Sequence, residues 1–276
     1  MTDDYDPRPS VHGAGEAVVL VPGMDGTGRL FYSQLPLLAR SYRVATYALR
    51  DRAATMDVLV ADLTRVLATV SATARRAIVS GASFGGALAM SLALTHPERV
   101  GALVILNSFP YFAPQVRLRL AMLGLNAMPW GAMGLVRRLT ASRMHSPHTH
   151  RQEIERFMQL TATANRDGYV NRLKLLTQYD VRHRLHELRA PTLFLAAERD
   201  HLVPSVAQAR YMAARVPGSI LRILAGHGHI CLIAPDLDLW RILQEWGGGS
   251  SSPCALSQLE GAITSARKSL SSAAPV

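Results

Sequence analysis

The stretch AIVSGASFGGALAMSLAL, residues 77–94, constrains the fold more than any other part of the sequence. It begins with apolar, β-branched residues typical of a buried strand and ends in residues that are apolar all round, as in a helix buried against a sheet. The two runs meet at Gly81-x-Ser83-x-Gly85. A Cβ atom at either glycine would clash where a strand turns sharply into a helix packed on it. The stretch therefore predicts a strand–turn–helix unit of the α/β class.

Other segments repeat this alternation along the chain. Met56, Leu59, Leu63, Val66 and Val70 are spaced as on the buried face of an amphipathic helix over residues 56–72. Strand, helix, strand in succession predicts a mostly parallel sheet with helices on both faces. Six runs that are apolar on both faces predict its buried strands, at residues 17–23, 42–49, 76–82, 101–108, 191–198 and 219–226.

The interval 110–185 breaks this rhythm, because it is rich in Leu, Met and Arg and contains no apolar run of strand type. A crossover between parallel strands needs only about a dozen residues, so the interval predicts an inserted helical cap. From residue 247 the sequence becomes Gly/Ser-rich, as in a flexible linker. The predicted organisation is an N-terminal tail (1–15), an α/β core (16–109 and 186–246), the helical cap (110–185), and a linker with a C-terminal tail (247–276).

Composition narrows the cellular context. No apolar run is long enough to span a bilayer, and the N-terminus MTDDYDPRPS is acidic and contains proline, unlike a signal peptide. Cys231 and Cys254 are the only cysteines, so we expect no disulfide framework. These features favour a cytoplasmic protein.

The net charge of +10 comes almost entirely from arginine, because Lys174 and Lys268 are the only lysines. Residues 109–185 hold twelve basic and four acidic side chains. The arginines carry no interleaved aromatic stripe and no nucleic-acid motif, so we expect a solvated, arginine-rich surface and no nucleic-acid partner. An acidic carrier protein or an anionic surface remains an alternative partner for this region. The oligomeric state is left open.

A serine hydroxyl is a weak nucleophile without a base, and the base needs an acid to orient it. Asp200 follows the fifth predicted strand, in ERDHLVP, and His227 and His229 follow the sixth, in LAGHGHICLIAP. Because the carboxyl ends of parallel strands meet at one edge, these side chains are expected near Ser83. Asp200 has two plainer alternatives, namely capping the helix that begins near residue 204 or pairing with Arg199. Glu198 is the weaker candidate acid.

Three motifs, LVPGMDGTG, SGASFGG and AAERDHLVP…GHGH, resemble in order and spacing those of the α/β-hydrolase superfamily over about residues 16–246. The resemblance implies the α/β-hydrolase fold and a Ser83–His229–Asp200 triad that needs neither metal nor organic cofactor. The family's usual Pro-Gly-Ala-Gly-His pattern selects His229 over His227 as the base. The resemblance also implies an oxyanion hole formed by the backbone N–H groups of Met24 and Phe84.

Two departures from the family pattern stand out. Many members have His-Gly in the oxyanion loop, where this chain has Pro22-Gly23. Only about fifteen residues precede the first predicted strand, too few for the family's usual first two strands, so we expect a sheet of about six strands. The oxyanion loop and the serine motif are also locally similar to those of plant and cyanobacterial phytyl ester synthase-type proteins.

The predicted activity is cleavage of small carboxylic esters through an acyl-enzyme, with short to medium acyl chains. Acyl transfer from the same intermediate is the nearest alternative, and a non-catalytic binding protein on the same fold is a second. Epoxide hydrolases and haloalkane dehalogenases are disfavoured, because those relatives have an aspartate where Ser83 stands.

Substrate contacts are predicted from the oxyanion loop, at Gly23 and Asp25, although Asp25 has the alternative of stabilising its own turn. In the cap, an acyl pocket is predicted from Trp130 and four methionines (Met122, Met128, Met133 and Met144), with plain core packing as the alternative. His145, His148 and His150 fall in a polar loop. We expect them at the surface and predict no metal site, because no carboxylate or cysteine nearby in the sequence completes a ligand set.

Overall fold

The computed structural model describes residues 5–71, 76–112 and 143–247. In chain order its elements are β1 (Ser10–His12), β2 (Glu16–Val21), η1 (Arg29–Phe31), α1 (Leu35–Leu38), β3 (Tyr42–Thr46), α2 (Met56–Val70), β4 (Ala77–Ala82), α3 (Phe84–Thr95), η2 (Pro97–Arg99), β5 (Val100–Leu106), α6 (Arg151–Ala162), α7 (Arg166–Gln178), η4 (Arg182–Glu187), β6 (Thr192–Ala197), α8 (Ser205–Ala213), β7 (Ile220–Leu224) and α9 (Leu239–Trp246).

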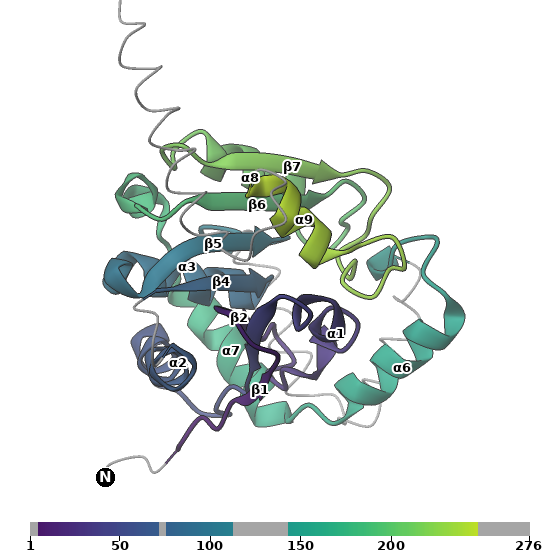
Figure 1. Ribbon diagram of the computed structural model, residues 1–276, viewed down its shortest axis with the longest axis horizontal. Helices are drawn as coiled ribbons and strands as arrows, with labels where there is room; N and C mark the ends of the chain where they lie inside the picture. The colour runs from purple at the N-terminus through teal and green to yellow at the C-terminus, as the bar shows by residue number, and fades with distance from the viewer. Residues whose placement is uncertain (1–4, 72–75, 113–142, 248–276) are drawn as a thin grey trace, which may run out of the picture.

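The strands form one sheet in the order β1-β3-β2-β4-β5-β6-β7 (Figure 1). The six strands expected from the sequence are present and run parallel, from β2 to β7. A seventh strand, β1, pairs antiparallel with β3, with Ser10 opposite Thr46. From the sequence, the residues of β1 are expected in the N-terminal tail. All three are exposed, so β1 carries no apolar pattern that could have identified it.

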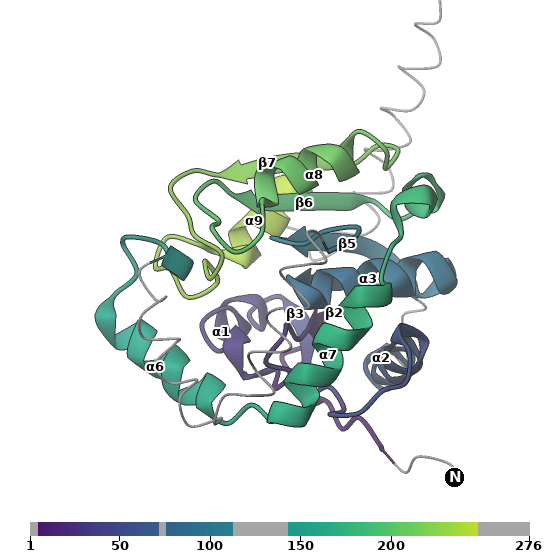
Figure 2. The ribbon, with the colours of Figure 1, turned by 180° about the vertical axis from the view of Figure 1, so that it is seen from behind.

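Both faces of the central strands β2, β4, β5 and β6 are buried, which explains why these strands are largely apolar. In β2, Val19 and Val21 join a core cluster with residues of α2, α3, α7 and α8. Val18 and Leu20, which point to the opposite face, join a second cluster with residues of α1 and α9. Figures 1 and 2 show these two helix layers on opposite sides of the sheet. Each face therefore has its own core, as the parallel arrangement requires.

The strand β7 differs from its sequence interpretation as a strand buried on both faces. It lies at the edge of the sheet, and Ile220 and Ile223 are 49% and 39% exposed. An edge strand has a neighbour on one side only, so apolar composition alone does not establish its burial. The two predicted helices agree better: α2 and α3 begin at Met56 and Phe84, as expected.

The described part of the interval 110–185 contains α6, α7 and η4. Helix α6 lies beyond the carboxyl ends of the strands (Figure 1), whereas Leu173, Leu175 and Leu176 of α7 join the core cluster that contains α2 and α3. The division into core, cap and tails stays a prediction. Residues 113–142 and 248–276, and with them Trp130 and Cys254, lie outside the described residues.

Several arginines of this interval have local partners. Arg151 pairs with Glu155 and Arg182 pairs with Asp180, both at the surface. The attraction of this region for an acidic carrier or an anionic surface stays a prediction. Within the described ranges, every helix is too short or too polar to cross a membrane.

A side chain at position 85 should destabilise the fold. A Cβ atom there would lie 2.3 Å from the carbonyl oxygen of Val21 and 2.7 Å from that of Pro22, both backbone atoms that cannot move aside cheaply. Gly85→Ala should therefore lower the free energy of unfolding by about 3 kcal/mol or more. Urea unfolding followed by tryptophan fluorescence measures the loss.

Gly226→Ala is the matched control. Gly226 has a φ of +73°, but a Cβ atom there would meet nothing within 4 Å. Gly226→Ala should lower the free energy of unfolding only by the penalty for a left-handed backbone, about 1 kcal/mol. Equal losses in the two variants would contradict the close-approach argument.

Candidate active site

Ser83 lies in the turn between β4 and α3, with a φ of 55° and a ψ of −120°. The turn is tight because a Cβ atom on Gly81 would lie 2.3 Å from the carbonyl oxygen of Gly85. Two hydrogen bonds hold this strained residue. The N–H of Ser83 donates to the carbonyl of Leu106, the last residue of β5 (2.9 Å), and Ser108 Oγ, just after β5, donates to the carbonyl of Ser83 (2.7 Å). The serine motif therefore occupies the strand-to-helix turn that the sequence predicts.

The amino end of α3 adjoins Ser83, because Phe84 is the first residue of the helix. The first N–H groups of a helix have no carbonyl partner within the helix, and the helix dipole places partial positive charge at this end. Negative charge that develops on an atom beside Ser83 would be stabilised there.

The loop that follows β2 is held from the distant helix α7. Arg172 Nε donates to the carbonyl of Met24 (2.9 Å) and Nη2 donates to the carbonyl of Asp25 (3.2 Å), while Nη1 reaches the carbonyl of Arg50 (3.4 Å). Arg172 is 1% exposed, and burial lowers the pKa of its guanidinium, which the charges of neighbouring carboxylates only partly offset. Gly26 provides the space for the guanidinium of Arg172, because a Cβ atom at position 26 would lie only 2.6 Å from it.

Sequence reasoning missed Arg172. It treated this arginine as one of the solvated, arginine-rich surface, whereas the side chain is buried in contact with the loop that follows β2. The sequence holds only a weak signal for the burial of Arg172. This arginine immediately precedes the apolar Leu173 and lies on the side of α7 that faces the core.

Within the same loop, Asp25 accepts hydrogen bonds from the N–H of Thr27 (2.8 Å) and from its hydroxyl. The N–H of Gly26 donates to the carbonyl of Gly23 at 3.1 Å. Asp25 thus stabilises its own turn, one of the two roles considered for it, and both Gly23 and Asp25 also line the cavity described below.

Asp200 and His229 are hydrogen bonded, with 2.7 Å between Asp200 Oδ2 and His229 Nδ1. The other carboxylate oxygen, Oδ1, accepts from the N–H groups of Leu202 and Val203, both at 2.9 Å, and Ser205 Oγ donates to Oδ2. Burial by itself raises the pKa of Asp200, but the hydrogen bonds from His229, Ser205 and Val203 outweigh it, so the pKa lies below its ordinary value. Asp200 is thus a buried, ionised partner of His229 that also organises the start of α8.

The two alternative residues have other partners. His227 Nδ1 lies 2.9 Å from Ser146 Oγ, and its Nε2 lies 3.5 Å from Asp236. Burial lowers the pKa of His227. Glu198 accepts from the N–H of Gly226 at 2.8 Å. Of the two histidines, it is His229 that hydrogen bonds Asp200.

A cavity of about 360 Å³ joins these elements. Ser83, His229 and Met24 line it together with Gly23 and Asp25. The rest of its wall is largely apolar and includes Leu30, Phe31, Met144, Phe157, Met158, Ile230, Leu232 and Ile233. Met144 is thus the described member of the predicted acyl pocket that reaches the cavity, whereas Met122, Met128, Trp130 and Met133 lie outside the described residues.

Asn107, at the end of β5, is a second residue that sequence reasoning missed. Its Nδ2 donates to the carbonyl of His229 (2.9 Å) and its Oδ1 accepts from the N–H of Ala197 (2.7 Å). These bonds tie residues 225–238, the loop between β7 and α9 that we call the histidine loop, to β6. Asn107 has a φ of 47°, a conformation that asparagine tolerates better than most residues. The available signal was a polar Asn-Ser pair at the end of an apolar strand.

His145 corrects the expectation that the histidines of the 145–150 loop lie at the surface. It is 5% exposed, lines the cavity, and packs edge-to-face on Phe157, whereas His150 is exposed as expected. Cys231, in the histidine loop, is buried, and burial raises the pKa of its thiol to about 12.

Comparison with known proteins agrees with this arrangement. The sequence model of the alpha/beta hydrolase fold family matches residues 16–234. RutD of Escherichia coli O157:H7 (strain EC4115 / EHEC), whose name provisionally describes it as a carbamate hydrolase, is 29% identical over 236 residues, which cover 81% of this chain and 88% of RutD.

Two solved structures share the fold. A thermophilic esterase from Thermogutta terrifontis matches with a TM-score of 0.75 and 22% identity, over 87% of this chain and 92% of the esterase. The enol-lactonase from Burkholderia xenovorans LB400 matches with a TM-score of 0.71 and 18% identity, over 81% and 89% of the two chains.

The lowered pKa of Asp200 predicts how the stability contributed by this carboxylate depends on pH. The folded protein holds a proton on Asp200 less readily than the unfolded chain, in which an aspartate has a pKa of about 3.9. The stabilisation is present above that value and is lost as pH falls through the lower folded pKa. Wild type should therefore exceed Asp200→Asn in free energy of unfolding at pH 6, and the difference should shrink toward about pH 2. Urea unfolding of both proteins across this range measures it, and a difference that grows on acidification would contradict the assignment.

Proposed function

The chain belongs to the alpha/beta hydrolase family, and from this premise we propose that it is a serine hydrolase that cleaves carboxylic esters through an acyl-enzyme on Ser83. The observation that carries the proposal is the hydrogen bond of 2.7 Å between Asp200 and His229, combined with the cavity that both His229 and Ser83 line. Because Asp200 binds Nδ1, the other ring nitrogen of His229 is the one available to accept the proton of Ser83.

In the proposed mechanism, Ser83 Oγ attacks the ester carbonyl carbon while His229 takes the hydroxyl proton. Asp200 keeps the imidazole in the required tautomer and stabilises the imidazolium. The N–H groups of Met24 and Phe84 stabilise the oxyanion of the tetrahedral intermediate, each contributing about 3 kcal/mol. His229 then protonates the leaving alcohol, and a water deprotonated by His229 releases the acid. Acyl transfer to an alcohol would use the same acyl-enzyme.

The wall of the cavity supports an ester with an aliphatic acyl group. Leucine, isoleucine, phenylalanine and methionine side chains supply most of it, and apolar surface favours burial of hydrocarbon over a small polar group. A carbamate, the substrate class in the name of RutD, is the second candidate because it would react at the same serine. The apolar wall favours the ester.

A fluorophosphonate probe tests the proposed nucleophile and base. It should label Ser83 in wild type, fail to label Ser83→Ala, and label His229→Ala at least about a thousandfold more slowly, because the hydroxyl loses its base. Peptide mass mapping locates the label. His227→Gln should keep at least about a tenth of the wild-type labelling rate, because His227 bonds Ser146 and not Asp200. A wild type that does not label, or a label on another serine, would rule out the proposal and favour a binding protein.

The buried guanidinium of Arg172 should affect kcat more than KM. If it fixes the oxyanion loop, Arg172→Met should lower kcat about tenfold to a hundredfold with little change in KM, because the oxyanion forms only after attack. Steady-state hydrolysis of p-nitrophenyl butyrate measures both constants, and circular dichroism checks the fold.

Lys174→Met is the matched control, since Lys174 is exposed on the same helix. It should leave kcat unchanged. A loss confined to KM in Arg172→Met, or an equal loss of kcat in the control, would contradict the positioning role of Arg172.

A further inference from the structure

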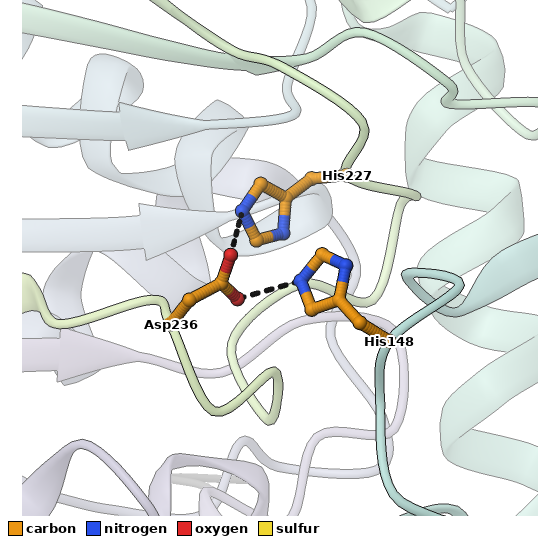
Figure 3. Close-up of side chains that lie close together, drawn as sticks. All are labelled: His148, His227 and Asp236. Atoms are coloured by element: carbon orange, nitrogen blue, oxygen red, sulfur yellow. Dashed lines mark hydrogen bonds and ion pairs between the residues drawn. The ribbon is translucent and has the colours of Figure 1, made fainter.

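One side chain of the segment before α6, His148, meets two side chains of the histidine loop, His227 and Asp236, and none of the three lines the cavity. His148 precedes α6, His227 follows β7, and Asp236 precedes α9. Their ligand atoms all lie within 4.8 Å of one another, the one such group of three among the described residues (Figure 3). No metal site is expected from the sequence, because no carboxylate near His148 along the chain completes a ligand set. The fold supplies a carboxylate from a position 88 residues away from His148.

The two nitrogen-to-oxygen distances lie on either side of the spacing between ligands that a small divalent ion requires. His148 Nε2 lies 2.6 Å from Asp236 Oδ1, and His227 Nε2 lies 3.5 Å from Asp236 Oδ2. Zinc bonds of about 2.0–2.2 Å in tetrahedral geometry place ligand atoms about 3.3 Å apart. The two imidazoles already direct Nε2 at the carboxylate, so small side-chain rotations bring the three ligands to that spacing. Two imidazoles and one carboxylate suit zinc and its transition-metal neighbours, whereas magnesium prefers oxygen ligands.

A second layer of contacts orients the buried ligand. His227 is 6% exposed, and its Nδ1 lies 2.9 Å from Ser146 Oγ, which also accepts from the N–H of Gly228 at 3.3 Å. Histidines that bind metals through Nε2 are commonly held by a hydrogen bond at the opposite ring nitrogen. His148 and Asp236 are partly exposed, so an ion can reach the site from solvent.

The same loops hold the base of the proposed triad. The N–H of Ile230 donates to the carbonyl of Met144 at 2.8 Å. A Cβ atom on Gly228 would lie 2.6 Å from the carbonyl oxygen of His145, so the two loops approach as closely as backbones allow. His229 lies between Gly228 and Ile230 in this paired segment.

We propose that His148, His227 and Asp236 form a binding site for a zinc-type divalent ion, with solvent in the fourth position, that clamps the 144–150 segment to the histidine loop. The site is distinct from the cavity and does not depend on the proposed catalysis. A bound ion would bridge two segments, residues 144–150 and the histidine loop, that in the described residues are otherwise joined here by hydrogen bonds and single ion pairs.

The test uses the full chain after treatment with a chelator. Zinc titrated against a competing chromophoric chelator should bind one to one with a micromolar or tighter dissociation constant. It should also raise the Tm by several degrees when in large excess over that constant. Cobalt should give the visible absorption of a tetrahedral site, and magnesium should do neither. His148→Ala and Asp236→Asn should each weaken zinc binding by about tenfold or more.

His150→Ala is the matched control, because His150 is exposed on the same segment and belongs to no such group. It should bind zinc as wild type does. The proposal is overturned if wild type binds no zinc in the micromolar range. It is equally overturned if His148→Ala and Asp236→Asn, with folds verified by circular dichroism, bind zinc as tightly as wild type. Loss of binding only in His229→Ala would place the ion at the triad instead.

Discussion

The close packing of α3 against β2 and β4 determines where every other part of the site must lie. No side chain fits at Gly81 or Gly85, because the backbone of the neighbouring segment occupies the position that a Cβ atom would take. Ser83 is thereby forced to a positive φ, at a cost of about 1–2 kcal/mol, which is offset by its hydrogen bonds to β5 and Ser108 and by burial of the apolar α3. The result is one hydroxyl raised at the carboxyl edge of the sheet, beside the positive end of a helix dipole.

Around Ser83, hydrogen bonds from distant segments hold the loops that form the rest of the site. Arg172 of α7 reaches the carbonyls of the loop after β2, and Asn107 of β5 reaches the carbonyl of His229. A buried guanidinium costs free energy unless its donors are satisfied, so Arg172 is stable in this position only while the loop keeps its shape. The same contact therefore links the stability of α7 to the shape of the loop that follows β2.

The histidine loop is likewise held by hydrogen bonds from distant segments. His229 is held by Asp200 through its ring and by Asn107 through its backbone, and the paired 144–150 segment lies against the residues on either side of it. His227, in the same loop, uses its ring for Ser146 and Asp236 instead of Asp200. Two histidines only two positions apart thus face different partners, and the ion site proposed for His227 would brace the loop without entering the cavity.

Local spacing in the sequence determined the six parallel strands, the helices α2 and α3, the turn at Ser83, and the order of the serine, acid and histidine motifs, because each rests on a period or a motif of a few residues. The same signals could not find β1, which is short and exposed, or the exposure of β7, which depends on which strand has no neighbour. Nor could they find the burial of Arg172 and His145, the roles of Asn107, or the meeting of His148 with Asp236. Those contacts join segments tens of residues apart, so only the closure of the chain in three dimensions decides which polar side chains are buried and which partners they meet.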